Sequence, residues 1–316
     1  MTFKSLKKDE IIDVISPATA CTLDEIAQIK NFLKKSNLTP NIFLEKETTL
    51  KKPQSHEFPS FAAAMRFEQF KKAAQNPDSN LIWCTRGGYG SAEILPFLEK
   101  MTKPKKPKIL IGFSDISSLN KILVEKWGWQ VVSAPMLAQI VLKKVSPKAV
   151  KAILDLVFGR LNELKFQLKS LNNVKTPTAA SHVVGGCISV LSGQFGTKNQ
   201  INWDGKILFL EDEGEDGERL DRYFSQIVCV FVEQKKYPSA IVLGNFLQTN
   251  PHGTPKAKNI KMAIERFAQN LADKNLKIPL FEEKSKCLGH SKDMLPLVLG
   301  LETKIMASGV LVQKIS

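Results

Sequence analysis

The stretch Lys108–Leu123, "KILIGFSDISSLNKIL", decides how the chain folds and raises the question of what it does. An apolar run, Ile109–Ile111, is followed by GFSD (112–115) and then by a helical pattern. This corner between strand and helix allows two interpretations. Either Ser114 is an exposed nucleophile, or Ser114 or Asp115 caps the helix, as such residues usually do.

Around this stretch, segments typical of strands and helices alternate through the first half of the chain. We expect strands at 11–17, 41–46, 80–85, 108–113 and 130–135, with helical patterns between them. The first of these helices starts with Thr22 and Glu25, which form a capping-box pattern. Such alternation predicts a mostly parallel sheet with helices on its faces.

The composition changes after the helical segment 147–161. Asn, Thr and Pro punctuate residues 165–187, so we interpret this segment as a connection. Beyond it we expect strands at 206–213 and 240–246, a helix at 259–275, and paired strands at 294–315 around a Gly-Leu-Glu-Thr turn. The sequence therefore predicts an α/β protein. A mostly parallel sheet flanked by helices would occupy residues 1–168, and a β-rich domain would occupy residues 169–316.

Length and composition narrow the class of protein. The chain has 316 residues, 43% of them hydrophobic, which is enough for a large core. The N-terminus lacks the apolar stretch of a signal peptide, and no window approaches the roughly 18 apolar residues that span a bilayer. The five cysteines are scattered without a CxxC pair, which argues against a disulfide framework or a zinc ribbon. We expect a soluble, cytoplasmic protein with no membrane contact.

The formal net charge of +14 raises the question of nucleic-acid binding. The lysines are spread along the chain, and the one basic run, KPKKPK (103–108), is interrupted by prolines. No helix-turn-helix, zinc-finger or RNP pattern is present. We therefore expect no nucleic-acid partner. An anionic small substrate would suit a basic protein as well.

Polar, glycine-rich sequence follows two of the expected strands. RGGYG (86–90) follows the third strand, and GFSD (112–115) follows the fourth. Ligands collect at the carboxyl ends of parallel strands, so both loops would face one crevice if the strands are neighbours. RGGYG matches neither nucleotide-binding glycine pattern. Its glycines allow a turn that aims N–H groups at a ligand, or an ordinary tight turn.

A serine nucleophile needs a base and a carboxylate that orients the base. The base would be one of four histidines, His56, His182, His252 or His290, and spacing alone does not choose among them. Among the carboxylates, Glu211 stands out because it ends an apolar run. It either points into a cleft or belongs to a solvated acidic loop.

Taken together, these residues resemble the LD-carboxypeptidase family of serine peptidases, which also contains the microcin-immunity type. The matching motifs run in order along nearly the whole chain: VISPA (14–18), RGGYGS (86–91), IGFSDIS (111–117), APM (134–136), GGCISVLSGQFGT (185–197), LFLEDEGE with LDR (208–222) and GH (289–290). Any one of them alone would be weak, but RGGYG, GFSD and LFLED together are specific.

The resemblance implies a serine–histidine–glutamate triad of Ser114, His290 and Glu211. It implies an oxyanion hole made by the backbone N–H groups of Asp115 and Gly88. Arg86, beside these glycines, is a candidate for binding the terminal carboxylate of the substrate, or it pairs with an acidic neighbour to hold its loop.

The implied fold is an α/β domain carrying the serine and a β-rich domain supplying the other two triad residues. The implied protein is a homodimer that needs no metal or cofactor. Its substrate would be the cytoplasmic murein tetrapeptide, from which it removes the terminal D-alanine during peptidoglycan recycling.

Two departures from the family pattern put substrate preference in doubt. The family often has His-Gly-Pro-Met where this chain has Ser-Ala-Pro-Met (133–136), and an asparagine where it has Cys187. One alternative is a microcin-immunity type peptidase acting on aminoacyl-nucleotide amides, which an aromatic residue near the site would favour. Another is a catalytically silent protein that binds murein fragments, although all three triad positions hold the right residue types.

Overall fold

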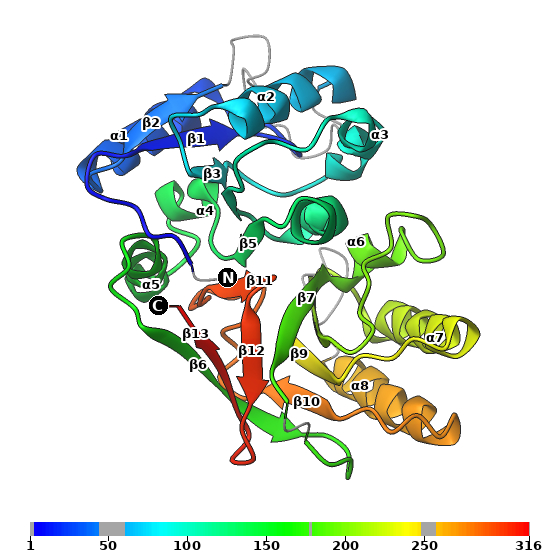
Figure 1. The fold of residues 1–316 in the computed structure, drawn as a ribbon. Coiled ribbons are helices and arrows are strands. Elements are labelled where there is room, and N and C mark those ends of the chain that lie inside the picture. The colour runs from blue at the N-terminus through cyan, green and yellow to red at the C-terminus, as the bar shows by residue number, and fades with distance from the viewer. Residues whose placement is uncertain (1–2, 44–60, 177–178, 248–256, 316) are drawn as a thin grey trace.

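The computed structural model describes residues 3–43, 61–176, 179–247 and 257–315, which form an open sheet and a closed barrel side by side (Figure 1). The open sheet has the strand order β11-β5-β4-β3-β1-β2. Its strands are β1 (Ile11–Ile15), β2 (Thr39–Ile42), β3 (Leu81–Cys84), β4 (Ile109–Ile111), β5 (Gln130–Ser133) and β11 (Leu297–Leu299). Strands β1 to β5 are all parallel, so the predicted parallel sheet is confirmed. Of the second expected strand, 41–46, the last three residues lie outside the described residues.

Helices and short helical turns connect the strands of this sheet. They are α1 (Leu23–Lys35), α2 (Ala63–Gln75), η2 (Ser91–Ile94), α3 (Leu95–Lys100), η3 (Ser114–Leu119), η4 (Lys121–Lys126), α4 (Leu137–Val141) and α5 (Pro147–Val157). The predicted capping box is confirmed, because Thr22 accepts a hydrogen bond from the Glu25 N–H and the Glu25 carboxylate accepts one from the Thr22 N–H. The strands β3, β4 and β5 are buried along their whole length, as is typical of a parallel sheet covered on both faces.

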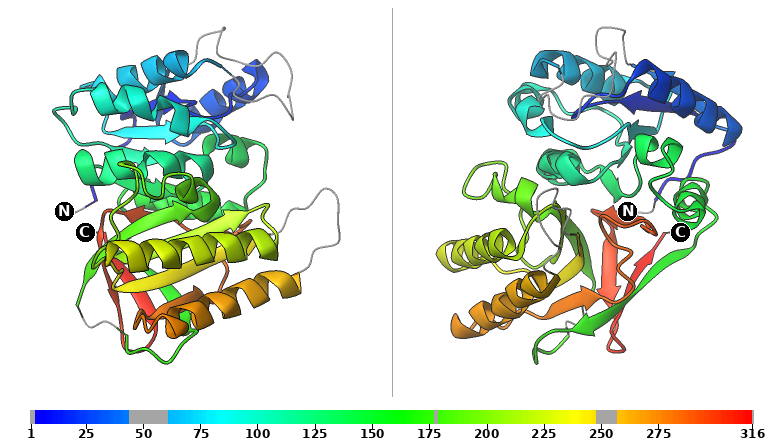
Figure 2. Two further views of the ribbon diagram at one scale, coloured as in Figure 1. Left: turned by 90° about the vertical axis from the view of Figure 1, so that its right-hand side faces the viewer. Right: turned by 180° about the vertical axis from the view of Figure 1, so that it is seen from behind.

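The barrel closes in the order β10-β6-β13-β12-β7-β8-β9. Its strands are β6 (Glu163–Ser170), β7 (Ser181–Cys187), β8 (Ile207–Glu213), β9 (Ala240–Leu247), β10 (Leu280–Glu283), β12 (Glu302–Ile305) and β13 (Val310–Lys314). The helices α6 (Ile188–Ser192), α7 (Gly217–Gln234) and α8 (Ala257–Asp273) lie on its outer side (Figure 2). The predicted α/β class with a β-rich second half is therefore confirmed.

Alternate side chains of β8 belong to two cores. Ile207 and Phe209 join the hydrophobic core that continues into the open sheet. Leu208 and Leu210 join a second core with α7 and α8. This two-residue period places the next residue in the first series, Glu211, on the side of the open sheet. The register of β8 against β9 also shifts between Leu210 and Asp212, a local irregularity of the kind that re-aims side chains next to active sites.

The interpretation of residues 165–187 as a connection is wrong at both ends. β6 and β7 occupy most of that segment, and only the residues between them connect. In β6, buried Leu164, Phe166 and Leu168 alternate with exposed polar residues. This is the pattern of a half-buried strand, and the Asn and Pro punctuation nearby concealed it.

The expected strand pairing at 294–315 is only half right. β12 and β13 pair antiparallel as expected, but β11 leaves the barrel and pairs antiparallel with β5 of the open sheet. Gly300, with φ of +80°, follows β11 and faces Val124 and the Trp129 carbonyl, so the turn packs against the open sheet. The chain ends also lie close together, since the Phe3 N–H donates to the Ile315 carbonyl at 3.2 Å. The division near residue 168 stays a prediction.

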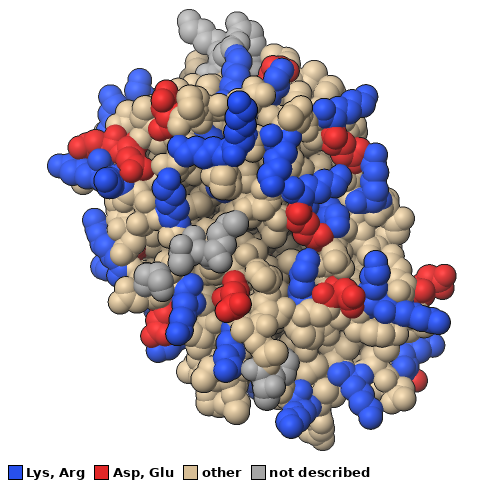
Figure 3. All heavy atoms as spheres, viewed as in Figure 1, with Lys and Arg blue, Asp and Glu red and all other residues tan. Residues whose placement is uncertain are grey.

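Basic side chains are spread over the surface. On the face shown in Figure 3, Lys and Arg cover both halves of the molecule and alternate with acidic residues instead of forming one stripe. In the described parts of the chain, no helix is both long and apolar enough to cross a membrane.

Candidate active site

The corner after β4 has the backbone of a nucleophile elbow. Ser114 has φ of +60°, a left-handed conformation that is uncommon for residues other than glycine and that clusters at functional sites. The helix η3 begins at Ser114, and its N-cap is the extended residue Phe113. The capping interpretation of the corner is therefore wrong: Ser114 is a partly exposed residue that lines a cavity.

Asp115 uses its carboxylate to hold the neighbouring glycine loop. Its side chain is buried and accepts a hydrogen bond from the Ser91 N–H at 2.8 Å. Burial raises the pKa of this carboxyl above its ordinary value, although the hydrogen bonds from Ser91 oppose the rise. Because Asp115 ties the end of RGGYGS to the elbow, the two loops that the sequence placed at one crevice do meet there.

The glycine loop approaches Ser114 through Gly87. A Cβ atom on Gly87 would lie 3.1 Å from the Ser114 Cβ and 3.3 Å from its Oγ. Gly88 has φ of +103° and packs against Thr19, whose Oγ1 would lie 2.2 Å from an added Cβ. Both glycines line the cavity with Ser114. A side chain at Gly88 would clash with Thr19, and one at Gly87 would press tightly on Ser114. The oxyanion role of Gly88 and Asp115 stays a prediction.

Arg86 lies at the cavity and is also held from behind. Its Nη2 lies 3.2 Å from Glu25 Oε1, and its Nη1 donates to the Ala20 carbonyl at 3.3 Å. The pairing with an acidic neighbour is therefore present. The guanidinium still lines the cavity, which leaves the substrate-binding role open as a prediction.

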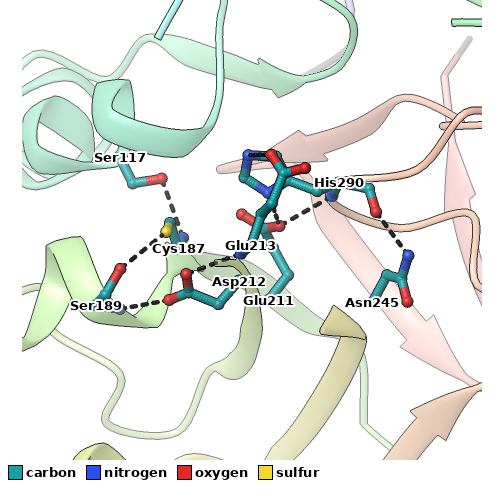
Figure 4. A network of polar contacts seen from close by, with 8 residues as sticks. All are labelled: Ser117, Cys187, Ser189, Glu211, Asp212, Glu213, Asn245 and His290. Atoms are coloured by element: carbon teal, nitrogen blue, oxygen red, sulfur yellow. Dashed lines mark hydrogen bonds and ion pairs between the residues drawn. The ribbon is translucent and has the colours of Figure 1, made fainter. Parts of the chain in front are cut away.

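Glu211 and His290 form a buried pair at the end of β8 (Figure 4). The Nδ1 atom of His290 lies 2.6 Å from Glu211 Oε2, and the same oxygen accepts a hydrogen bond from the His290 N–H at 3.0 Å. Asn245 on β9 donates to the His290 carbonyl at 2.6 Å, and the Phe113 ring lies 4.6 Å from the imidazole centroid. Backbone, carboxylate and aromatic ring therefore fix the orientation of this histidine.

His290 lines the same cavity as Ser114, Gly87 and Gly88. Burial works to lower the pKa of His290, but the charge of Glu211 and its hydrogen bond, with further attraction from Glu213 and Asp212, outweigh it and raise the pKa to about 9. The Glu211 carboxylate can hold an imidazole in one tautomer and stabilise its protonated form, which are the two tasks of the acidic member of a catalytic triad.

The neighbouring residues brace this pair against the elbow (Figure 4). Asp212 accepts a hydrogen bond from the Ser189 N–H at 2.8 Å, and burial raises the pKa of Asp212 to about 6. Ser117 of η3 accepts a hydrogen bond from the Cys187 N–H at 3.1 Å. A Cβ atom on Gly186 would lie 2.4 Å from the Ser117 Oγ, so a glycine is needed where β7 meets the elbow helix.

The other histidines do not belong to this site as far as the structure describes them. His182 is exposed on β7, opposite Glu302 of β12. His56 and His252 lie outside the described residues. Within the described ranges, no group of three or more His, Cys, Asp and Glu residues is placed to hold a metal ion.

The cavity lined by Ser114, His290, Gly87 and Gly88 has a volume of about 540 Å³. Its lining from the described residues includes the cations Arg86, Lys144 and Lys292 and the carboxylate Glu213. Sequence reasoning missed Gly87, Phe113, Glu213 and Asn245. Glu213 lies in the quoted LFLEDEGE motif and Phe113 in GFSD, but nothing in the order of residues shows which members of a motif reach the cavity.

Comparison with known proteins identifies the family. Profiles described as the LD-carboxypeptidase N-terminal and C-terminal domains match residues 12–134 and 180–305. A Rickettsia conorii protein named "Putative carboxypeptidase" is 30% identical over 305 residues, covering 95% of this chain and 89% of its own. The chain belongs to the LD-carboxypeptidase family, a family of peptidases.

Two further likenesses bear on function and fold. The murein tetrapeptide carboxypeptidase of Pseudomonas aeruginosa is 29% identical over 226 residues, covering 68% of this chain and 69% of its own. The crystal structure of an MccF-like protein from Bacillus anthracis matches with a TM-score of 0.78 at 20% identity, over 99% of each chain. The second likeness shows the shared fold.

Gly289 offers a test of how the Glu211–His290 pair is built. It has φ of +87°, and an added Cβ would lie 2.5 Å from Glu211 Oε2. We expect Gly289→Ala to cost about 1–3 kcal/mol of unfolding free energy. We also expect it to lower peptidase turnover at least about tenfold, because the methyl group displaces the carboxylate. Urea unfolding and turnover measure the two effects.

Gly205→Ala is the matched control. Gly205 also has positive φ, at +65°, but an added Cβ there meets no atom of the described residues within 4 Å. Gly205→Ala should lose unfolding free energy to the same backbone strain as Gly289→Ala, but it should keep full turnover. Equal turnover in both variants would show that the close approach of Gly289 does not position Glu211.

Proposed function

We propose that the chain is a serine-type LD-carboxypeptidase that removes the terminal D-alanine from murein tetrapeptides, with Ser114, His290 and Glu211 as its triad. The observation that carries the proposal is the cavity that is lined both by Ser114, with its left-handed backbone, and by His290, which is bound to Glu211. The Pseudomonas aeruginosa relative supports the choice of substrate. We extend the proposal to a cytoplasmic homodimer on the family resemblance alone.

In the proposed first step, Ser114 Oγ attacks the carbonyl of the diamino acid while His290 Nε2 takes its proton. The resulting oxyanion accepts hydrogen bonds from the backbone N–H groups of Asp115 and Gly88, each of which would be worth about 10²–10³ in rate. The tetrahedral intermediate collapses, the C–N bond breaks, and the D-alanine amine leaves with the proton from His290. The diamino acid remains as an ester on Ser114.

In the second step, His290 takes a proton from a water molecule that attacks this ester. Collapse of the second intermediate releases the tripeptide and returns the proton to Ser114. Glu211 stabilises the imidazolium that forms in both steps. The cations Arg86, Lys144 and Lys292 give the cavity a charge that suits the carboxylate of the terminal D-alanine.

The proposal is tested with two murein peptides that differ by one residue. Purified protein is incubated with the tetrapeptide and with the pentapeptide, and products are followed by mass spectrometry. We expect loss of a single alanine from the tetrapeptide alone, since the pentapeptide ends in a bond between two D-residues. A folded protein that cleaves neither peptide would overturn the proposal and direct the search to aminoacyl-nucleotide amides.

A further inference from the structure

A second carboxylate lies against the catalytic face of His290. Glu213, the last residue of β8, has its Oε2 atom 3.4 Å from His290 Nε2 (Figure 4). Nε2 is the atom that the proposed mechanism requires to take the Ser114 proton. In the structure, therefore, carboxylates face both ring nitrogens: Glu211 faces Nδ1 and Glu213 faces Nε2.

This arrangement holds the histidine in the wrong state for catalysis. A carboxylate accepts hydrogen bonds only, so two of them stabilise the imidazolium, in which both nitrogens carry protons. Of the charged groups around the ring, Glu211, Glu213 and Asp212 all come from β8 and are negative. The cations Arg86, Lys144 and Lys292 line the cavity from other segments. For His290 to act as a base, Glu213 must move away from Nε2.

The Glu213 side chain is exposed enough to move, and it is the carboxylate available to a cation in the cavity. Its side chain is 40% exposed, whereas that of Glu211 is 1% exposed and held by two hydrogen bonds. Among the described residues that line the cavity, Glu213 is the one carboxylate. A cationic group that enters the cavity would therefore find this side chain as its counter-ion.

We infer that Glu213 binds the side-chain ammonium group of the residue whose carbonyl is attacked, and that it leaves His290 Nε2 in doing so. The inference rests on the proposed function and deepens it. Both diamino acids of murein, diaminopimelate and lysine, carry an ammonium group on the ε carbon of this side chain, where diaminopimelate also carries a carboxylate. Glu213 leaves the imidazolium of His290 and pairs with the ammonium group of the substrate. Without this counter-ion, His290 loses its Nε2 proton to solvent and can then take the proton of Ser114.

Two substrates and two variants test the inference. The substrates are the murein tetrapeptide and the same peptide with its side-chain amine acetylated. We expect the wild type to prefer the free amine in kcat/KM by about fivefold, as an ion pair of this exposure allows. In Glu213→Gln this preference should fall to about onefold. Glu218→Gln, an exposed glutamate in the first turn of α7 outside the cavity lining, is the matched control and should keep the wild-type preference.

The pH dependence gives a readout that a merely structural role would not move. In the free enzyme, His290 must lose a proton whose pKa is raised to about 9, so kcat/KM should rise with pH toward that value. For the free-amine peptide, kcat should rise at lower pH than kcat/KM does, because Glu213 has moved to the substrate in the complex. In Glu213→Gln, the rise of kcat/KM with pH should shift to lower pH by about one unit.

The outcomes separate this inference from the proposed function. Cleavage of the tetrapeptide with equal preference for free and acetylated amine in the wild type would overturn the inference and leave the function standing. A pH profile of kcat/KM that rises at the same pH in Glu213→Gln as in the wild type would also overturn the inference. If the wild type cleaves neither peptide, the proposed function itself has failed.

Discussion

Replacing Ser114 with alanine is expected to abolish turnover of the murein tetrapeptide, by a factor of about 10⁴ or more. The substitution removes the oxygen that attacks the carbonyl in the proposed mechanism, and loss of a triad nucleophile leaves only the catalysis supplied by binding and by an oxyanion hole. Ser114→Ala keeps the left-handed backbone at φ of +60° and removes a single partly exposed atom, so we expect thermal unfolding to change little. Mass spectrometry of the released alanine measures the effect.

The control for this variant is Ser308→Ala, which makes the same change at an exposed turn between β12 and β13. It should retain full turnover. Binding of the uncleaved tetrapeptide to Ser114→Ala, measured by calorimetry, shows whether the cavity survives. A folded Ser114→Ala variant that binds the peptide and still releases alanine at more than about a hundredth of the wild-type rate would exclude Ser114 as the nucleophile.

The open sheet could be predicted from the sequence because its signals are local. An apolar run, a glycine corner and a helical period follow one another in the stretch Lys108–Leu123, and the capping box at Thr22 announces the first helix. The barrel could not be predicted in the same way. β6 pairs with β13, almost 150 positions further along the chain, and no local pattern specifies that partner. The pairing of β11 with β5 of the open sheet likewise depends on tertiary structure and not on a local sequence pattern.

The site residues likewise divide into those that motifs indicate and those whose contacts depend on tertiary structure. The motifs bring Ser114, Glu211 and His290 to attention by family resemblance, and the structure places His290 on Glu211 and in one cavity with Ser114. The contact of Glu213 with Nε2 could not be predicted, because it depends on how far β8 extends past its irregular register. Glu211 and Glu213, two positions apart in one motif, thus contact the same ring but differ in exposure: Glu211 is buried at Nδ1, and Glu213 at Nε2 is open to the cavity.

The second large effect is expected for Glu211→Gln, which should lower kcat by about 10⁴ and leave KM nearly unchanged. An amide keeps the shape of the carboxylate but loses the charge that stabilises the imidazolium, and it can hold the ring in the wrong tautomer. The variant also buries an amide nitrogen at the place of Glu211 Oε1, which is buried without a hydrogen-bond partner among the described residues. We expect this to cost about 1–3 kcal/mol of unfolding free energy.

The pH dependence of stability separates the charge of Glu211 from its shape. Because folding raises the pKa of His290 from 6.5 to about 9, its protonation stabilises the folded state fully below pH 6.5, and this contribution disappears as the pH rises through 9. Wild-type unfolding free energy should therefore fall between these values. In Glu211→Gln the fall should be much smaller, whereas Glu163→Gln, on the surface of β6, should retain it. An unchanged slope in Glu211→Gln would mean that Glu211 does not set the charge of His290, and its proposed place in the triad would then fail.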